Sequence, residues 1–273
     1  MSDLHKQKEN QSSTSKGDKD DFKLSCAQIE QFKIDGYLVL PSLLSNDELE
    51  KLRAITGEHS EQRIRPFELE TTVSYPGAPL DEAAEGGQTI RRLLMAYQRH
   101  KHFAKQAERV EITGSIKQIL NSENVVLNPN HHNCIMTKQP EFSSETLWHR
   151  DTRYWNFDNK YLINAWFALG DEHQENGAMK ILPGSHRWEV QERALDDAQF
   201  LKLEHPDNQY RLATQRLVTL NKGDVLLFSA HCFHAAGKNT TNSAKYSLVF
   251  TYHGEDTKPI PGTHSASKPE ISI

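Results

Sequence analysis

Eight short strand-like runs in the second half of the chain decide the fold: VVLN (125–128), HHNCIMTK (131–138), ETLWHRD (145–151), YLINAWFAL (161–169), AMKILP (178–183), QRLVTL (215–220), DVLLFS (224–229) and KYSLVFTYH (245–253). Turn-forming pairs such as Asn176-Gly177 and Pro183-Gly184 separate them. Short runs that are rich in β-branched and aromatic residues and bounded by turn signals are typical of an all-β block. We therefore expect a double-sheet jelly roll in this half of the chain.

Helical signals precede the β block. Ser25 to Gln28 form a capping box, and the helix that it opens is expected to stop at Gly36. The apolar run 36–44 then predicts a strand. A second capping box, Ser45 to Glu48, opens a helix that is expected to end at Gly57.

The next two segments complete the N-terminal half. Residues 58–88 carry several Gly and Pro and no clear period, which predicts a long loop. Residues 89–120 are predicted to be helical in two pieces. The expected fold class is therefore α+β, with a double-stranded β-helix (jelly-roll) core and N-terminal helices packed on it.

The first 22 residues contain few apolar side chains. Such a segment cannot bury enough apolar surface to offset its ordering entropy, so we expect 1–22 to be a disordered tail. Residues 23–273 are expected to form a single domain, because a segment of this length is a common size for one large domain.

Composition excludes several classes of protein. The net charge of −5 argues against a dedicated nucleic-acid binder, and no run of about 18 apolar residues is present for a membrane span. The N-terminus has no apolar stretch of the kind that a secretory signal requires. The three cysteines lack scaffold spacing and predict a reducing compartment. We expect a cytoplasmic protein that binds neither nucleic acid nor membrane.

A candidate metal site lies at the end of the third run, in the sequence Trp148-His149-Arg150-Asp151. His149 and Asp151 are two residues apart on a strand, so both side chains point to one face. A third ligand is expected from the segment SAHCFHAAGKN (229–239), which follows an apolar strand. Two histidines and one carboxylate on one face leave open positions, as in non-heme Fe(II) oxygenases, whereas zinc prefers four ligands or three plus water.

Several blocks together resemble a known family. They are GYLVLPSLLSNDELEKLR (36–53), MTKQP (136–140), WHRD (148–151), NAWFAL (164–169), ENGAMKILPGSH (175–186), KGDVLLFSAHCFHAAGKN (222–239) and KYSLVFTY (245–252). In order and spacing the chain is similar to the phytanoyl-CoA dioxygenase (PhyH) family of Fe(II)- and 2-oxoglutarate-dependent oxygenases. The resemblance covers roughly residues 25–252. It implies Fe(II) as the metal, with 2-oxoglutarate and O2 as co-substrates.

The same resemblance implies the metal ligands. His149, Asp151 and His234 match the family's ligand positions, because His234 directly precedes two small residues and a glycine. His231 is the alternative for the third ligand, since it lies in the same segment.

The resemblance also implies a pocket for 2-oxoglutarate, but the chain departs from the pattern there. The family usually has an arginine eleven residues after the distal histidine, and here that position is Lys245. It often has a serine two residues after that histidine, and here that position is Ala236. Lysine provides a point charge without the bidentate fork of arginine. Ser247, Trp166 and Arg91 are further candidates for this pocket. The alternatives are solvated side chains at Lys245 and Arg91 and a packing role for Trp166.

The function that follows is an Fe(II)/2-oxoglutarate-dependent dioxygenase. We expect it to hydroxylate an unactivated carbon of a small molecule, with release of succinate and CO2. Trp155 matches a position that walls the substrate cavity. The departures at Lys245 and Ala236 leave one alternative, a non-catalytic jelly-roll protein that senses a metal or small molecule. The substrate and the oligomeric state have no signal in the sequence.

Overall fold

The computed structural model describes residues 22–273, and its strands form two antiparallel sheets. The larger sheet has nine strands and runs β1-β10-β7-β12-β5-β3-β2, with β4 paired to β12 and β13 paired to β4. The smaller sheet runs β6-β11-β8-β9. The strands are β1 (Tyr37–Leu40), β2 (Phe67–Leu69), β3 (Ile90–Leu94), β4 (Val125–Leu127), β5 (Asn133–Lys138), β6 (Thr146–His149), β7 (Leu162–Ala168), β8 (Met179–Ile181), β9 (Arg216–Leu217), β10 (Val225–Ser229), β11 (His234–Ala236), β12 (Lys245–Gly254) and β13 (Ile271–Ser272).

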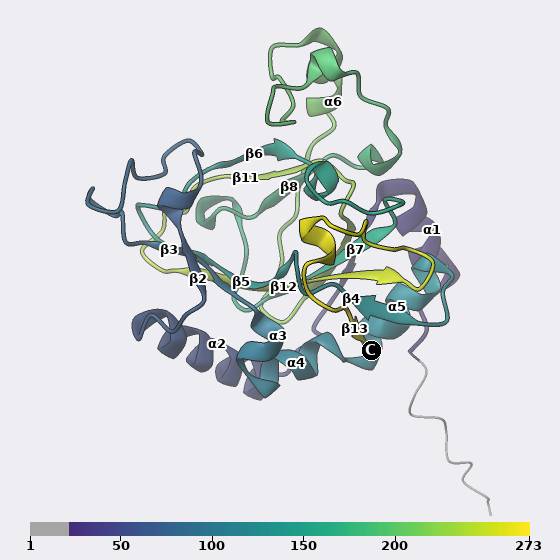
Figure 1. The fold of residues 1–273 in the computed structure, drawn as a ribbon, viewed down its shortest axis with the longest axis horizontal. Helices are drawn as coiled ribbons and strands as arrows, with labels where there is room; N and C mark the ends of the chain where they lie inside the picture. Colours follow the sequence, from purple (N-terminus) through teal and green to yellow (C-terminus); the bar gives the residue numbers. More distant parts are fainter. Residues whose placement is uncertain (1–21) are drawn as a thin grey trace, which may run out of the picture.

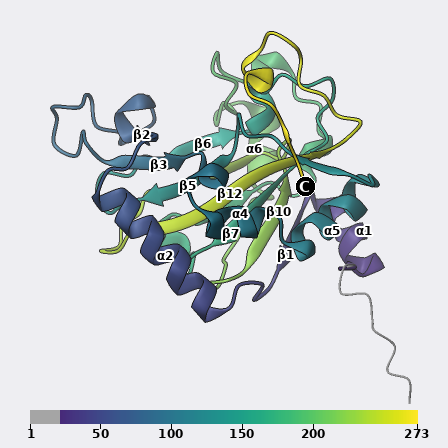
Figure 2. The ribbon, with the colours of Figure 1, turned by 60° about the horizontal axis from the view of Figure 1, so that its bottom comes forward.

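The helices lie outside the two sheets. They are α1 (Cys26–Asp35), α2 (Asn46–Glu61), α3 (Ala96–Arg99), α4 (Lys101–Ala107), α5 (Val110–Leu120) and α6 (Pro206–Leu212). Figure 1 shows α2, α3 and α4 below the larger sheet, with the smaller sheet on the other side. Figure 2 shows α2 lying across the outer face of the larger sheet. This arrangement is the expected jelly roll with helices packed on it.

Both predicted capping boxes are present. Ser25 Oγ accepts the backbone N–H of Gln28 at 3.2 Å, and the Gln28 side chain accepts the backbone N–H of Ser25 at 2.9 Å. Ser45 and Glu48 repeat the arrangement at the start of α2. Gly36 ends α1 with a φ of +79°, as its position in the sequence predicted.

The prediction for 58–120 was wrong in part. Helix α2 continues past Gly57 to Glu61, and the predicted loop contains the short strand β2. The predicted helix start at 89 is instead β3, which pairs with both β2 and β5. Within β3, Leu93 is completely buried. Pairing with two neighbours and burial in the core outweighed the helical period of this segment.

The main hydrophobic core lies between the larger sheet and the helices. Phe103, Ile116, Phe167 and Phe250 are among its fully buried side chains. Phe22 packs against this core, and its carbonyl accepts a hydrogen bond from Gln118 Nε2 at 2.9 Å. The rest of the predicted tail lies outside the described residues, so its disorder stays a prediction. Between residues 22 and 273, no helix has the length and apolar character that a membrane span needs.

Candidate metal centre

His149, Asp151 and His234 come together where the smaller sheet faces the interior. His149 ends β6, and His234 begins β11, which pairs with β6 so that the two histidines are register partners. Asp151 starts a single 3-10 turn (Asp151–Arg153) directly after β6. Because strand pairing fixes the two histidines side by side, the spacing of two residues brings the carboxylate to the same point.

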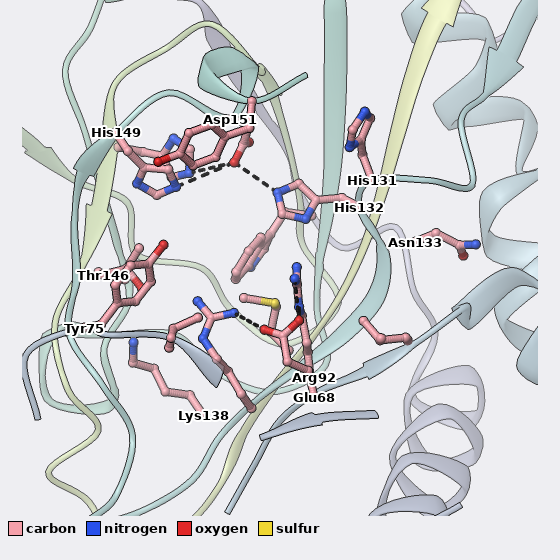
Figure 3. Close-up of a pocket in the computed structure, with 18 of the residues that line it drawn as sticks. Glu68, Tyr75, Arg92, His131, His132, Asn133, Lys138, Thr146, His149 and Asp151 are labelled. Atoms are coloured by element: carbon pink, nitrogen blue, oxygen red, sulfur yellow. Dashed lines mark hydrogen bonds and ion pairs between the residues drawn. The ribbon is translucent and has the colours of Figure 1, made fainter. Parts of the chain in front are cut away.

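The geometry suits a metal ion. Each of the three residues is buried, and their candidate ligand atoms lie within 4.8 Å of one another. Both histidine Nε2 atoms lie 3.6 Å from Asp151 Oδ1. The Nδ1 atoms donate to backbone carbonyls, of Leu147 at 2.8 Å and of Cys232 at 3.1 Å, so the Nε2 lone pairs face the shared point. Figure 3 shows His149 and Asp151 turned into the cavity.

The protonation states also suit a cation. Burial lowers the pKa of His234 to about 4, so its ring is neutral near pH 7. Burial alone would raise the pKa of Asp151, but the neighbouring rings of His132 and His234 hold it well below its usual range. A neutral imidazole and an ionised carboxylate are the states that bind divalent metals.

Asp151 has two further partners that sequence reasoning did not assign. Asn164 Nδ2 donates to Asp151 Oδ2 at 2.7 Å, and Thr251 Oγ1 donates to Asn164 Oδ1 at 2.6 Å. His132 Nε2 lies 3.1 Å from Asp151 Oδ1. Burial opposes a charged His132, yet the carboxylate of Asp151 outweighs it and raises the pKa of His132 to about 9. The available signal was the presence of polar Asn164 and Thr251 inside otherwise apolar strands.

Replacing Asn164 by alanine should weaken metal binding by roughly 10–100-fold, because it removes the hydrogen bond that orients Asp151. Titration of Mn(II) into the purified variant measures the effect. Asn208→Ala is the matched control, since Asn208 is equally buried but lies in α6, where it bonds to backbone carbonyls. Equal Mn(II) affinities of the two variants would show that the Asn164 bond has no part in positioning the carboxylate.

The alternative third ligand, His231, is oriented differently. Its Nδ1 lies 2.7 Å from Thr152 Oγ1, and it is not part of the cluster formed by the described residues. Burial lowers the pKa of His231 to about 3. The structure therefore brings His234, and not His231, to the other two residues.

The three residues open into a cavity of about 580 Å³. Trp155 lines it and stacks on the ring of His131, with ring centroids 4.4 Å apart. Arg91 also lines it, from β3 and not from a helix. Its guanidinium lies 3.4 Å from Glu68 and 3.9 Å from Glu70.

Lys245 and Trp166 reach the cavity, but their polar groups meet at an acidic residue that sequence reasoning did not assign. Lys245 Nζ lies 2.9 Å from Glu172 Oε2, and Trp166 Nε1 donates to Glu172 Oε1 at 2.9 Å. Ser247 Oγ donates to the same oxygen at 2.6 Å. The side chains of Lys245 and Glu172 are 4% and 1% exposed, so this is a fully buried ion pair.

Comparison with known proteins places this site in a family. The model of the phytanoyl-CoA dioxygenase (PhyH) family matches residues 32–247. The chain belongs to the phytanoyl-CoA dioxygenase family. That match includes all three residues of the cluster, together with the cavity-lining strands β3, β5, β6 and β11.

Two curated relatives match nearly the whole length of this chain. It is 26% identical to ectoine dioxygenase of Halomonas elongata, over 93% of this chain and 76% of the relative. It is 21% identical to the peroxisomal phytanoyl-CoA dioxygenase of Rattus norvegicus, over 87% of this chain and 70% of the relative. Both named activities are dioxygenations.

A solved structure confirms the fold. EctD from S. alaskensis, solved with 2-oxoglutarate and 5-hydroxyectoine, superposes with a TM-score of 0.70 at 18% identity. The match covers 90% of this chain and 82% of that chain. The jelly-roll core predicted from the sequence is therefore confirmed.

Proposed function

We propose that this protein is an Fe(II)- and 2-oxoglutarate-dependent dioxygenase that hydroxylates a small molecule and releases succinate and CO2. The observation that carries the proposal is the buried cluster of His149, Asp151 and His234 at the wall of a 580 Å³ cavity. Two imidazoles and one carboxylate on one face fit Fe(II) and leave coordination positions open. Among the described residues the cluster comprises three ligand residues, whereas structural zinc is bound by four.

When bound, Fe(II) and 2-oxoglutarate supply the oxidative chemistry that activates O2. The protein's own residues position and shield this chemistry. Asn164 and His132 hold the Asp151 carboxylate, and the backbone bonds at both Nδ1 atoms fix the imidazole rings. The buried ring of Phe228 packs edge-on against that of His234, with ring centroids 5.2 Å apart.

The substrate is proposed to enter beside Trp155. In this part of the cavity Trp155 and His131 form an aromatic wall. Burial lowers the pKa of His131 to about 3, so the wall is uncharged near neutral pH. Arg153 and Tyr75 also line the cavity, and Arg153 Nη2 donates to the Tyr75 hydroxyl at 2.9 Å. An apolar wall with a few polar groups is the usual make-up of a small-molecule site.

Ectoine and phytanoyl-CoA, named for the two relatives, are starting points for the substrate search. Residues 23–273 are proposed to form the catalytic domain, and the cytoplasm is its proposed location.

A substrate screen tests the proposal. The Fe(II)-loaded protein is supplied with 2-oxoglutarate, ascorbate and fractions of a metabolite extract, and succinate is measured. We expect one or more fractions to raise succinate release above the level without extract, and Asp151→Ala to abolish the rise. If the protein binds Fe(II) and 2-oxoglutarate but no fraction or condition yields succinate, a sensor is the better description.

A further inference from the structure

The position that the family pattern assigns to the distal carboxylate of 2-oxoglutarate already holds a carboxylate. Lys245 Nζ, Ser247 Oγ and Trp166 Nε1 all point to the side chain of Glu172, at 2.9, 2.6 and 2.9 Å. The four groups are buried, so the charge of Lys245 is neutralised within the protein. A second carboxylate brought to Lys245 would meet the negative charge of Glu172 at close range.

The neighbouring cation is Lys138. It lies at the end of β5, and its Cα is the register partner of Lys245 on β12. Its side chain lines the cavity, where Nζ donates to the carbonyl of Ser144 at 3.2 Å. Within residues 22–273, no carboxylate lies within 4.0 Å of this ammonium, in contrast to Lys245. Figure 3 shows Lys138 across the cavity from His149 and Asp151.

A glycine, Gly177, lies beside the side chain of Lys138. A Cβ on Gly177 would lie 2.5 Å from the backbone carbonyl oxygen of Gly237 and 2.7 Å from Lys138 Cε, so a larger residue here would crowd both the backbone and the lysine. Gly177 also has a φ of +75°, which glycine adopts without strain. Strand β5 therefore places the lysine at the cavity wall, and Gly177 leaves room for its side chain.

The charges around Lys138 favour an anion. Burial lowers its pKa to about 7, and the ammonium of Lys245 and the guanidinium of Arg91 lower it further than the carboxylates of Glu70 and Glu145 restore it. These four groups come from β12, β3, the turn Glu70–Thr72 and the segment before β6. An ammonium whose charged state is disfavoured by burial and by nearby cations is stabilised when an anion binds beside it.

We propose that Lys138 binds the distal carboxylate of 2-oxoglutarate. The Lys245–Glu172 ion pair then forms part of the pocket wall and does not bind the co-substrate. The assignment rests on the proposed function, because it presumes that the 2-oxo acid end of the co-substrate lies at the metal. It reassigns the binding charge from the strand β12, where the family pattern has it, to β5.

The proposal has a thermodynamic signature. At pH 8 most Lys138 side chains of the unliganded protein are neutral, because their pKa is about 7. Binding of a carboxylate to the ammonium raises that pKa, so the protein must take up a proton when 2-oxoglutarate binds. The affinity should then fall as pH rises from 7 to 9.

Calorimetric titration of the Mn(II)-loaded protein with 2-oxoglutarate tests the assignment. Two buffers of different ionisation enthalpy at pH 8 give the number of protons taken up. We expect the wild type to take up close to one proton. Lys138→Met should lose at least about tenfold in affinity together with the proton uptake. Lys138→Arg should keep most of the affinity but take up no proton, because arginine is charged throughout this range.

The matched control is the double variant Lys245→Met/Glu172→Gln, which removes the ion pair without leaving a buried charge. It should bind 2-oxoglutarate within a few-fold of the wild type. Its proton uptake should be smaller than in the wild type, because loss of the Lys245 ammonium raises the pKa of Lys138 in the unliganded protein. The assignment is overturned if the double variant loses the affinity while Lys138→Met retains it. If the wild type binds no 2-oxoglutarate, the proposed function fails as well.

A second measurement needs no variant and so does not depend on folding of the substituted chains. A lysine with a pKa near 7 is acetylated by acetic anhydride at neutral pH faster than ordinary lysines. In the Mn(II)-loaded wild type, 2-oxoglutarate should slow acetylation of Lys138 at least severalfold, measured by peptide mass spectrometry against exposed Lys222. Equal labelling of Lys138 with and without 2-oxoglutarate would contradict the assignment.

Discussion

Asp151→Ala should lose at least about 100-fold in affinity for Mn(II) or Fe(II). Removal of a residue that merely supports a ligand already costs roughly 10–100-fold, and Asp151 supplies the only carboxylate of the cluster among the described residues. The two histidines that remain carry no negative charge to offset that of a divalent ion. Metal titration followed by calorimetry measures the loss, and turnover of 2-oxoglutarate should disappear with it.

The control for Asp151→Ala is Asp207→Ala, which removes a carboxylate from the exposed start of α6. It should bind metal as the wild type does. Circular dichroism of both variants should match the wild type. Retention of metal affinity in Asp151→Ala would mean that His149 and His234 bind the ion with another group, with His132 the nearest candidate.

Glu172→Ala should lower the free energy of unfolding by about 3–5 kcal/mol. It leaves the ammonium of Lys245 in a position where that side chain is only 4% exposed and has no other acidic partner within the described residues. Breaking one side of a buried ion pair is costly because the remaining charge is uncompensated. Urea-induced unfolding at pH 7 measures the difference.

The double variant Lys245→Met/Glu172→Gln should recover most of that stability, since both charges are then absent. Glu175→Ala is the surface control three residues away, where the carboxylate is exposed and pairs with His173. It should change the free energy of unfolding by less than about 1 kcal/mol. A Glu172→Ala variant as stable as Glu175→Ala would show that Lys245 finds water or another acceptor.

The parts of the fold that local chemistry specifies were predictable. The capping boxes at Ser25 and Ser45 depend only on residues three positions apart, and the structure contains both. The β block followed from short apolar runs between turn signals. The strand β3 was not predictable in this way, because IRRLL has no local feature that distinguishes it from a helix and its neighbours β2 and β5 decide its state.

In the site, too, residues that depend on local spacing were predictable and residues that depend on tertiary contacts were not. His149 and Asp151 share a strand end, so their proximity was readable from spacing, and His234 came from the resemblance. Glu172 was not predictable, because it lies in the polar stretch GDEHQEN (170–176), which looks like a solvated turn. Its burial depends on three donors from β7 and β12. The role proposed for Lys138 depends on that ion pair, because Lys245 is paired with Glu172 whereas Lys138 has no ion-pair partner among the described residues.

The most direct measurement is the succinate formed from 2-oxoglutarate by the Fe(II)-loaded protein in air, with Asp151→Ala assayed beside it. Even without a substrate, enzymes of this kind are expected to turn over 2-oxoglutarate slowly. The wild type should therefore release succinate in proportion to the O2 consumed, and the variant should release none. Succinate at the same background level in both proteins, with metabolite extract present, would contradict the assignment of this cluster as the centre of an Fe(II)/2-oxoglutarate dioxygenase.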